Sequence, residues 1–326
     1  ANGHQYGQFP SSDLPRSFYT DNNDYHKPSC HHNWLKTHEE TAFNMPPNRR
    51  DLWMQFHNYY LNCLMDVDQH LGKVLDALER SGMADNTVVI FTSDHGEMGG
   101  AHGHRFKGPM VYKELMNVPL SICVPGITKG EYTNALASAV DIVPTILSFA
   151  GVTEIHRQAR YPFLKGYDLK SVVQAPKQAN PRARNAGGCL MMWNALSHTD
   201  IDFIKKSAKN SRTSGGLHHK TKPIQTGKNN RGFYKAIFDG RYKFARYFSP
   251  FEHHTPDNLN TLTQHNELEL YDTFNDNDEV DNLAHNLRKH SDIIIHMNGK
   301  LNQLIHQEVY NDSPNYFVGP EYLYKL

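Results

Sequence analysis

The chain has 326 residues, of which 38% are hydrophobic and 21% charged, a composition that excludes an intrinsically disordered protein. Lysine plus arginine and aspartate plus glutamate both total 34, so there is no basic excess to attract nucleic acid or anionic lipid. No apolar run approaches the roughly 20 residues that a helix needs to cross a bilayer, so no membrane span is expected.

Residues 1–47 are rich in Pro, Asn, His and Asp and show no sustained period, which predicts a long irregular segment. From about residue 48 to 81, apolar side chains recur at three- and four-residue steps. This spacing predicts a long helix with one face in the core, ending near Gly82. The stripe consists of Leu52, Phe56, Tyr59, Tyr60, Cys63, Val67, Leu71, Val74, Leu75 and Leu78.

Two short apolar runs follow, at residues 87–92 and 118–124, and each has the β-branched character of a strand buried on both faces. Residues 141–150 then predict a short helix. The alternation predicts an α/β fold with a mostly parallel central sheet flanked by helices. Cys63 and Cys123 lie in apolar patterns and are expected to be core thiols.

The chain changes character after residue 155, where periodicity weakens and the basic stretch 205–230 predicts a loop. Residues 233–247 predict a β-hairpin around Asp-Gly at 239–240, a pair typical of a type I′ turn. A strand at 269–272 and a helix at 288–308 complete this part. We therefore expect a larger α/β domain over residues 1–229 and a smaller α+β subdomain with an antiparallel sheet over residues 230–326.

Candidate chemistry gathers after the first strand, which ends in Ser-Asp-His-Gly-Glu at 93–97. Ligands bind beyond the carboxyl ends of strands in open α/β sheets, and an Asp in such a loop suits a divalent cation. A glycine-rich loop at 99–109 adds positive or switchable charge. A cation with a nearby lysine suits an oxyanion ester, although a helix cap or a solvated loop would use the same residues. The residues concerned are Asp94, His95, His102, His104, Arg105 and Lys107.

The run from Thr92 to Leu120 closely resembles the second signature region of sulfatases, which belong to the alkaline-phosphatase superfamily. Flanking segments agree with this family in the same order. The resemblance implies a sulfuric ester hydrolase of arylsulfatase type, and it covers about residues 50–150 and 230–285. The flanking segments are residues 66–78, 137–147, 239–247, 269–272 and 276–284.

The resemblance also implies a divalent metal centre. Asp94 matches a carboxylate ligand of the active-site metal, and His95 occupies the adjacent ligand position. An oxygen-rich ligand set favours Ca²⁺, while the imidazole of His95 keeps Mn²⁺ open.

A lysine contacts the transferable group of the ester in this family, and Lys107 matches it. Lys107 is therefore both a catalytic and a substrate-binding candidate. His102 and His104 are further catalytic candidates, and Arg105 is a substrate-binding candidate, because all three lie close to Lys107 in sequence. Glu97 is expected to support the loop.

The family's Cys- or Ser-x-Pro-x-Arg motif, whose first residue becomes the formylglycine nucleophile, is absent from the sequence, and Cys30 is followed by His-His-Asn-Trp. The resemblance therefore implies that the nucleophile and the remaining metal ligands lie in a missing N-terminal segment. Expected partners are a small-molecule or sugar sulfate ester and the chain's own N-terminal fragment as a second chain. Two alternatives remain: a phosphonate or phosphodiester hydrolase of the same superfamily, suggested by His95, and a non-catalytic binding or partner chain.

Overall fold

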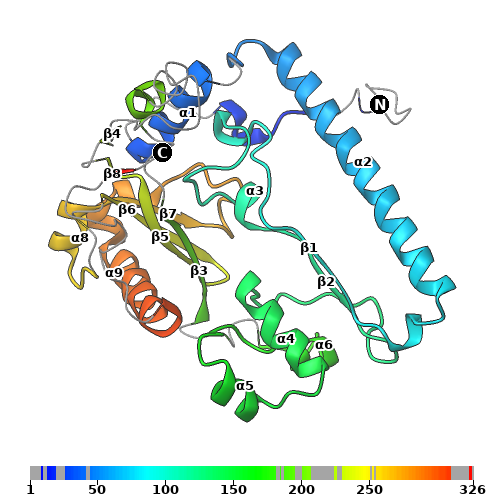
Figure 1. Cartoon of the computed structure of the whole chain (residues 1–326). Helices are drawn as coiled ribbons and strands as arrows, with labels where there is room; N and C mark the ends of the chain where they lie inside the picture. The colour runs from blue at the N-terminus through cyan, green and yellow to red at the C-terminus, as the bar shows by residue number, and fades with distance from the viewer. Residues whose placement is uncertain are drawn as a thin grey trace, which may run out of the picture. The chain divides into compact units, whose positions relative to one another are not determined.

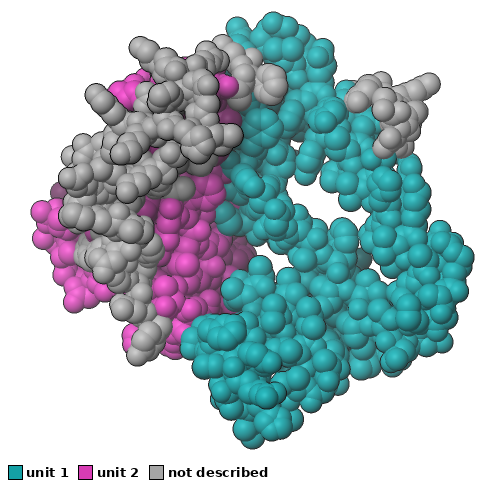
Figure 2. Space-filling model, viewed as in Figure 1, with its two compact units in different colours: residues 1–20, 45–107, 113–183 teal, residues 21–44, 108–112, 184–326 magenta. Residues whose placement is uncertain are grey.

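The computed structural model forms two compact units (Figure 1). Unit 1 comprises residues 1–20, 45–107 and 113–183, and unit 2 comprises residues 21–44, 108–112 and 184–326, as Figure 2 shows in teal and magenta. The structure describes residue 9 and residues 13–19, 26–41, 45–180, 184, 187–194, 200–206, 224–225, 230–249, 252, 255–309 and 323–324. Most of the predicted basic loop at 205–230 lies outside the described residues.

The long helix of unit 1, α2 (Arg50–Arg80), confirms the predicted helix, and Gly82 follows it with a left-handed φ of 69°. Its first turns are covered, because Trp53 is buried and lies edge-on to Phe18 in η1 (Arg16–Tyr19) with ring centroids 5.1 Å apart. The expectation of a continuous core face is wrong for the rest of the helix. Beyond Asn62, no side chain of α2 is buried.

The two predicted strands are present as β1 (Val89–Thr92) and β2 (Leu120–Cys123), but they pair antiparallel. Among the described residues no strand pair is parallel, so the mostly parallel central sheet is not observed. Nor are the strands buried on both faces, since Phe91 is 40% exposed and Cys123, an expected core thiol, is also exposed. An apolar run predicts a strand but carries no information on the direction of its partner.

Short elements complete unit 1. They are η2 (Ala84–Asn86), η3 (Ala101–Gly103), α3 (Lys113–Met116), η4 (Ala139–Asp141), α4 (Ile142–Phe149), α5 (Glu154–Arg160) and α6 (Lys170–Gln174). The predicted helix at 141–150 is thus confirmed as α4. Within the described residues no single helix is long and apolar enough to span a membrane, although the bent pair Ala139–Phe149 and Glu154–Arg160 meets both criteria together.

Unit 2 is built on a four-stranded antiparallel sheet in the order β3-β5-β6-β7. Helices α8 (Leu259–His265) and α9 (Leu287–Leu304), with the single turns η7 (Leu283–His285) and η8 (Ile305–Val309), accompany it, and β4 (Ile224–Gln225) pairs with β8 (Leu323–Tyr324). The strands of the sheet are β3 (Cys189–Asn194), β5 (Phe233–Phe238), β6 (Tyr242–Phe248) and β7 (Glu267–Asp272).

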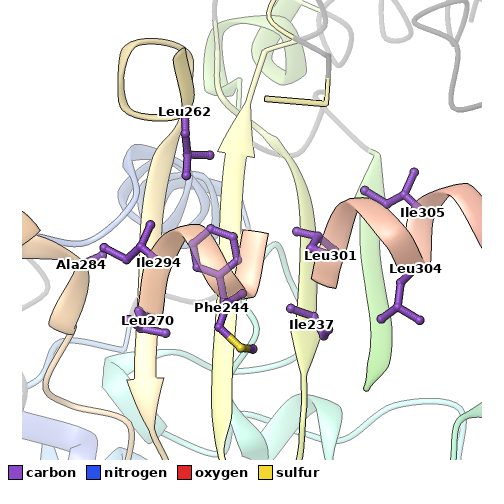
Figure 3. Packing of buried hydrophobic residues seen from close by; sticks show 10 residues of the cluster. Ile237, Phe244, Leu262, Leu270, Ala284, Ile294, Leu301, Leu304 and Ile305 are labelled. Carbon is purple, nitrogen blue, oxygen red and sulfur yellow. The ribbon is translucent and has the colours of Figure 1, made fainter. Parts of the chain in front are cut away.

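The core of unit 2 lies between this sheet and α9, where aliphatic and aromatic side chains are fully buried (Figure 3). Alternate residues of β5, β6 and β7 point to the helix, as the period of two in a strand requires. The cluster contains Ile237, Phe244, Leu262, Leu270, Ala284, Ile294, Met297, Leu301, Leu304 and Ile305. The predicted hairpin, strand and final helix are therefore confirmed, and with them the mixed α/β class and the antiparallel sheet.

The hairpin turn differs from the predicted type I′ turn. Only Gly240 has a positive φ, 94°, whereas a type I′ turn requires two such residues. Asp239 instead accepts hydrogen bonds from the backbone amides of Arg241 (3.0 Å) and Tyr242 (2.8 Å) through Oδ1. Its Oδ2 accepts from Lys300 Nζ at 2.9 Å, so an aspartate side chain stabilises a longer loop.

A helix also lies where an irregular segment is expected: α1 (Ser29–Thr41). Its buried residues are Cys30, His31, Trp34 and Thr37, none of which is aliphatic. The last segment of unit 2 begins at residue 184, because β3 hydrogen-bonds to β5 along its whole length and so joins the later sheet. The predicted division into two domains at residues 229 and 230 stays a prediction.

A buried carboxyl group lies inside unit 2. Glu269 is fully buried and accepts hydrogen bonds from the hydroxyls of Tyr247 (2.6 Å), Tyr271 (2.7 Å) and Tyr112 (3.3 Å). Burial raises the pKa of Glu269 above its ordinary value, and the hydroxyls oppose that shift by stabilising the carboxylate. The hydroxyls replace the hydrogen bonds that water would make.

Candidate functional site

The loop after β1 is held by a close backbone contact. The Gly96 amide donates to the Leu115 carbonyl at 2.8 Å, and a Cβ at position 96 would lie 1.9 Å from the Glu114 carbonyl oxygen. Only glycine fits there. Ser93 Oγ donates to the His95 carbonyl at 2.9 Å and further fixes the loop. The backbone therefore leaves β1 on one defined path, which presents Asp94 and His95 at the strand's carboxyl end.

His95 is oriented by its own backbone. Nδ1 lies 2.9 Å from the Gly96 carbonyl and donates to it, which leaves the lone pair on Nε2. Nε2 accepts from Lys107 Nζ at 2.8 Å and lies 3.3 Å from Asp94 Oδ2. Three predicted site residues therefore meet at one ring nitrogen.

Asp94 is the most exposed member of this group, since its side chain is 82% exposed and that of His95 is 37% exposed. The His95 backbone amide donates to Asp94 Oδ1 at 2.9 Å and is the main reason that the pKa of Asp94 lies below its ordinary value. The nearby positive charge of Lys107 acts in the same direction. Asp94 is thus an ionised carboxylate that is open to a ligand.

Glu97 organises the glycine-rich loop, as expected. Its Oε1 accepts from the backbone amides of Gly99 (3.0 Å) and Phe106 (2.5 Å), so one carboxylate joins the two ends of the loop. His57 of α2 also hydrogen-bonds through Nε2 to the Gly99 carbonyl. Sequence reasoning missed His57 and Ser93. The available signal for His57 was its position on the apolar stripe of α2, where an isolated imidazole needs a polar partner.

The other predicted residues have a different environment. His102 and His104 are 0% and 1% exposed, and Arg105 is 6% exposed. The His102 amide donates to Ser17 Oγ at 3.4 Å, and its φ of 52° is in the left-handed region. Their burial favours a structural role in the loop, whereas Asp94, His95 and Lys107 are open to solvent. Catalytic roles for His102 and His104 and a substrate role for Arg105 stay predictions.

The donor set of Asp94 and His95 suits a divalent metal in part. A carboxylate oxygen and an imidazole lone pair 3.3 Å apart can share one cation, and metal-ligating histidines commonly donate their other nitrogen to a backbone carbonyl. Two ligands are fewer than any common metal requires. Throughout the described ranges, no group of three or more His, Cys, Asp or Glu side chains could hold a metal. The residues fit one side of a metal centre.

Comparison with known proteins relates part of the chain to one family. Residues 4–152 match the family model described as Sulfatase. This segment belongs to the sulfatase family. The N-acetylglucosamine-6-O-sulfatase of Bacteroides thetaiotaomicron is 39% identical to the chain over 101 residues, and arylsulfatase K of Gallus gallus is 36% identical over 120 residues.

The sulfatase likeness covers only part of each relative. The matched stretches are 31% and 37% of this chain but 18% and 22% of the two relatives. Among solved structures, the phosphonate monoester hydrolase of Silicibacter pomeroyi matches with a TM-score of 0.65 at 17% identity, over 95% of this chain and 53% of that chain. At that identity the match shows the fold alone. The chain spans about half the length of this sulfatase-like fold.

Proposed function

We propose that this chain supplies one side of the active site of a sulfuric ester hydrolase. The observation that carries the proposal is the convergence of Asp94, His95 and Lys107 at one ring nitrogen within the sulfatase-family segment. Anion, cation and imidazole at a single point suit the binding of a metal and a negatively charged ester.

Asp94 and His95 would hold the divalent cation, with Ca²⁺ favoured by the carboxylate and Mn²⁺ by the imidazole. Once bound, a cation polarises the ester group and offsets its negative charge. Lys107 Nζ uses the same Nε2 lone pair of His95. If that lone pair were directed to a bound cation, the Lys107 ammonium would be available to donate to the oxygens of the ester and would stabilise the charge that develops on them.

The nucleophile is proposed to be a formylglycine carried by polypeptide outside these 326 residues. Two observations support this: the sequence contains no Cys- or Ser-x-Pro-x-Arg motif, and the chain spans 53% of a solved structure of the same fold. Both the nucleophile and the further metal ligands would then complete the half-site at Asp94 and His95.

The substrate is proposed to be a sulfate monoester of a sugar or a phenol. The names of the two relatives, an N-acetylglucosamine-6-O-sulfatase and an arylsulfatase, support this class. The second candidate is a phosphonate or phosphodiester hydrolase of the same superfamily, which the resemblance suggests because His95 stands at a metal-ligand position where some such relatives carry histidine. The third candidate is a non-catalytic partner chain, for which we expect no ester hydrolysis.

The test compares kcat/KM for an aryl sulfate and the aryl phosphonate with the same leaving group, in the protein that joins these residues to a formylglycine segment. Lys107→Ala should lower kcat/KM for the sulfate on the order of 100-fold, as the loss of one preorganised charge does. Because Lys107 is exposed, the same substitution should change the free energy of unfolding of the protein by less than about 0.5 kcal/mol.

The matched control is Lys129→Ala, which removes another exposed lysine of unit 1 and should leave kcat/KM unchanged. Preference for the phosphonate would favour the second candidate. Equal sulfatase activity in the wild type and Lys107→Ala would contradict the role given to Lys107.

A further inference from the structure

Helix α2 carries a single apolar stripe of which only the N-terminal part is covered. Trp53 and Phe56 lie on the stripe and contact aromatic rings, Phe18 at 5.1 Å and Phe106 at 6.0 Å between centroids. The same stripe continues for four more turns, at three- and four-residue steps, as Leu64, Val67, Leu71, Val74, Leu75 and Leu78. Val67 is 57% exposed and Val74 is 65% exposed. An amphipathic stripe of this width is normally buried against another element.

Helix α4 repeats this pattern. One face is packed within unit 1: Thr145 is buried, and its hydroxyl accepts from the Leu169 amide at 2.9 Å. The opposite face, together with the preceding turn η4, presents Val140, Val143 and Ile146, which are between 47% and 49% exposed. These three residues follow a helical step, so they form a second apolar stripe without a cover among the described residues of unit 1.

Strands β1 and β2 pair only with each other in the described part of the chain, which leaves both outer edges free. Cross-strand partners share a face, so Phe91 with Ser121 and Thr92 with Leu120 lie on opposite faces of the pair. Phe91 is 40% exposed and Leu120 is 37% exposed, so apolar side chains are open on both faces. A two-stranded pair is marginally stable alone and gains stability from further strands.

The exposure is particular to unit 1. In unit 2 the equivalent side chains of β5, β6 and α9 are fully buried (Figure 3). Figure 2 shows open gaps through unit 1, beside α2 and the β1–β2 pair, in place of a filled interior. The exposed residues, which we call the unit 1 apolar set, are Leu64, Val67, Val74, Leu75, Phe91, Leu120, Val140, Val143 and Ile146.

We infer that the unit 1 apolar set is a docking surface for a polypeptide that carries the other half of a sulfatase fold. The match to the Silicibacter pomeroyi structure uses 95% of this chain and leaves 47% of that chain (100 minus 53) without a counterpart. A half of a fold that has its own helices and strands can cover two apolar stripes and extend the free edges of β1 and β2 together. The inference rests on the sulfatase fold that the proposed function assumes, but it does not depend on the proposed reaction.

Binding to a named probe tests the inference. The chain is co-expressed with the part of the Bacteroides thetaiotaomicron N-acetylglucosamine-6-O-sulfatase that precedes its matched stretch, and the complex is measured by affinity capture and sedimentation. We expect a one-to-one complex. Val67→Glu on α2 and Val143→Glu on α4 should each weaken it at least tenfold, because a carboxylate would be buried without a partner.

The matched control is Gln69→Glu, which adds the same charge on the exposed polar side of α2 and should leave binding unchanged. Three results would overturn the inference. They are the absence of a complex, a complex that Val67→Glu and Val143→Glu do not weaken, and self-association of this chain that both substitutions abolish, since a second copy would then be the occupant. Because the measurement is binding, loss of activity through Asp94, His95 or Lys107 would not affect it.

Discussion

The imidazole of His95 links the two charged groups of the candidate site, because Nε2 contacts both Asp94 and Lys107. The position of Asp94 and His95 followed from the sequence, since a buried-strand pattern ended at them. Lys107 is twelve residues further along the chain, and spacing alone did not bring it to His95. The loop reverses through left-handed residues, among them Gly99, Gly100 and Gly103. A sequence indicates such flexibility but not the path taken.

Asp94→Asn should weaken the binding of Ca²⁺ or Mn²⁺ by about 10- to 100-fold, because an amide oxygen carries no net charge for the cation. The measurement is a calorimetric titration, with each metal, of the protein that joins these residues to a formylglycine segment, since Asp94 and His95 supply only one side of the metal centre. Asn keeps the size of the side chain, so the circular dichroism spectrum should be unchanged.

The lowered pKa of Asp94 also fixes the sign of the pH effect on metal binding. The Asp94 carboxylate stays ionised at any pH above 3.8, its ordinary pKa, and becomes protonated only at lower pH. Acid should therefore weaken metal binding through Asp94 only below pH 3.8. Equal metal affinity in the wild type and the variant would mean that Asp94 is not a metal ligand.

Elements with a strong period were predictable, and their surroundings were not. Helix α2 and strands β1 and β2 appeared where apolar side chains recur at helical steps or in short β-branched runs, because these patterns are local and can be seen in the sequence. The antiparallel pairing of β1 and β2 was not predictable, since both directions use the same apolar run. Helix α1 was missed because cysteine, histidine, tryptophan and threonine replace the usual aliphatic residues on its buried side.

Two glycines of unit 1 should respond in opposite ways to substitution by alanine. Gly96→Ala should lower the free energy of unfolding by about 2 kcal/mol or more, because its Cβ would overlap the Glu114 carbonyl oxygen. Gly72→Ala, within α2 and with no atom within 4 Å of the added Cβ, should raise it by up to about 1 kcal/mol. Thermal and urea unfolding provide the measurement. A stable Gly96→Ala variant would mean that the loop after β1 is not held by this contact.

At the scale of the whole molecule, contact between distant segments decides which residues form a unit. Residues 21–44 and 108–112 join the later sheet in unit 2, although they lie far from it in sequence. Tyr112 illustrates this, because its hydroxyl donates to Glu269 across 157 positions. Composition and local period carry no record of such contacts, so the sequence could not predict that separate segments form one compact unit.

The buried Glu269 should make the stability of unit 2 depend on pH. Burial raises the pKa of Glu269 above the value of 4.5 that it has when unfolded, so the folded state binds this proton more tightly. The resulting stability is present below pH 4.5 and is lost as pH rises through the folded pKa. Relative to Glu269→Gln, the wild type should lose at most about 1.4 kcal/mol per pH unit in that window. Urea unfolding at a series of pH values measures this, with Asp257→Asn at an exposed site as the control. The assignment would be contradicted if the free energy of unfolding of the wild type, relative to that of Glu269→Gln, increased with pH.

The same hydroxyl groups give unit 2 an optical signature. Burial, with the adjacent Glu269 carboxylate, raises the pKa of Tyr112, Tyr247 and Tyr271 well above 10.0, so these phenols cannot ionise while the unit is closed. Tyr132 in unit 1, by contrast, is 93% exposed. In alkali the ultraviolet absorbance of tyrosinate should therefore appear in two steps, an immediate one from exposed phenols and a delayed one as unit 2 opens. The rate of the second step reports the opening of unit 2 without any added dye or label.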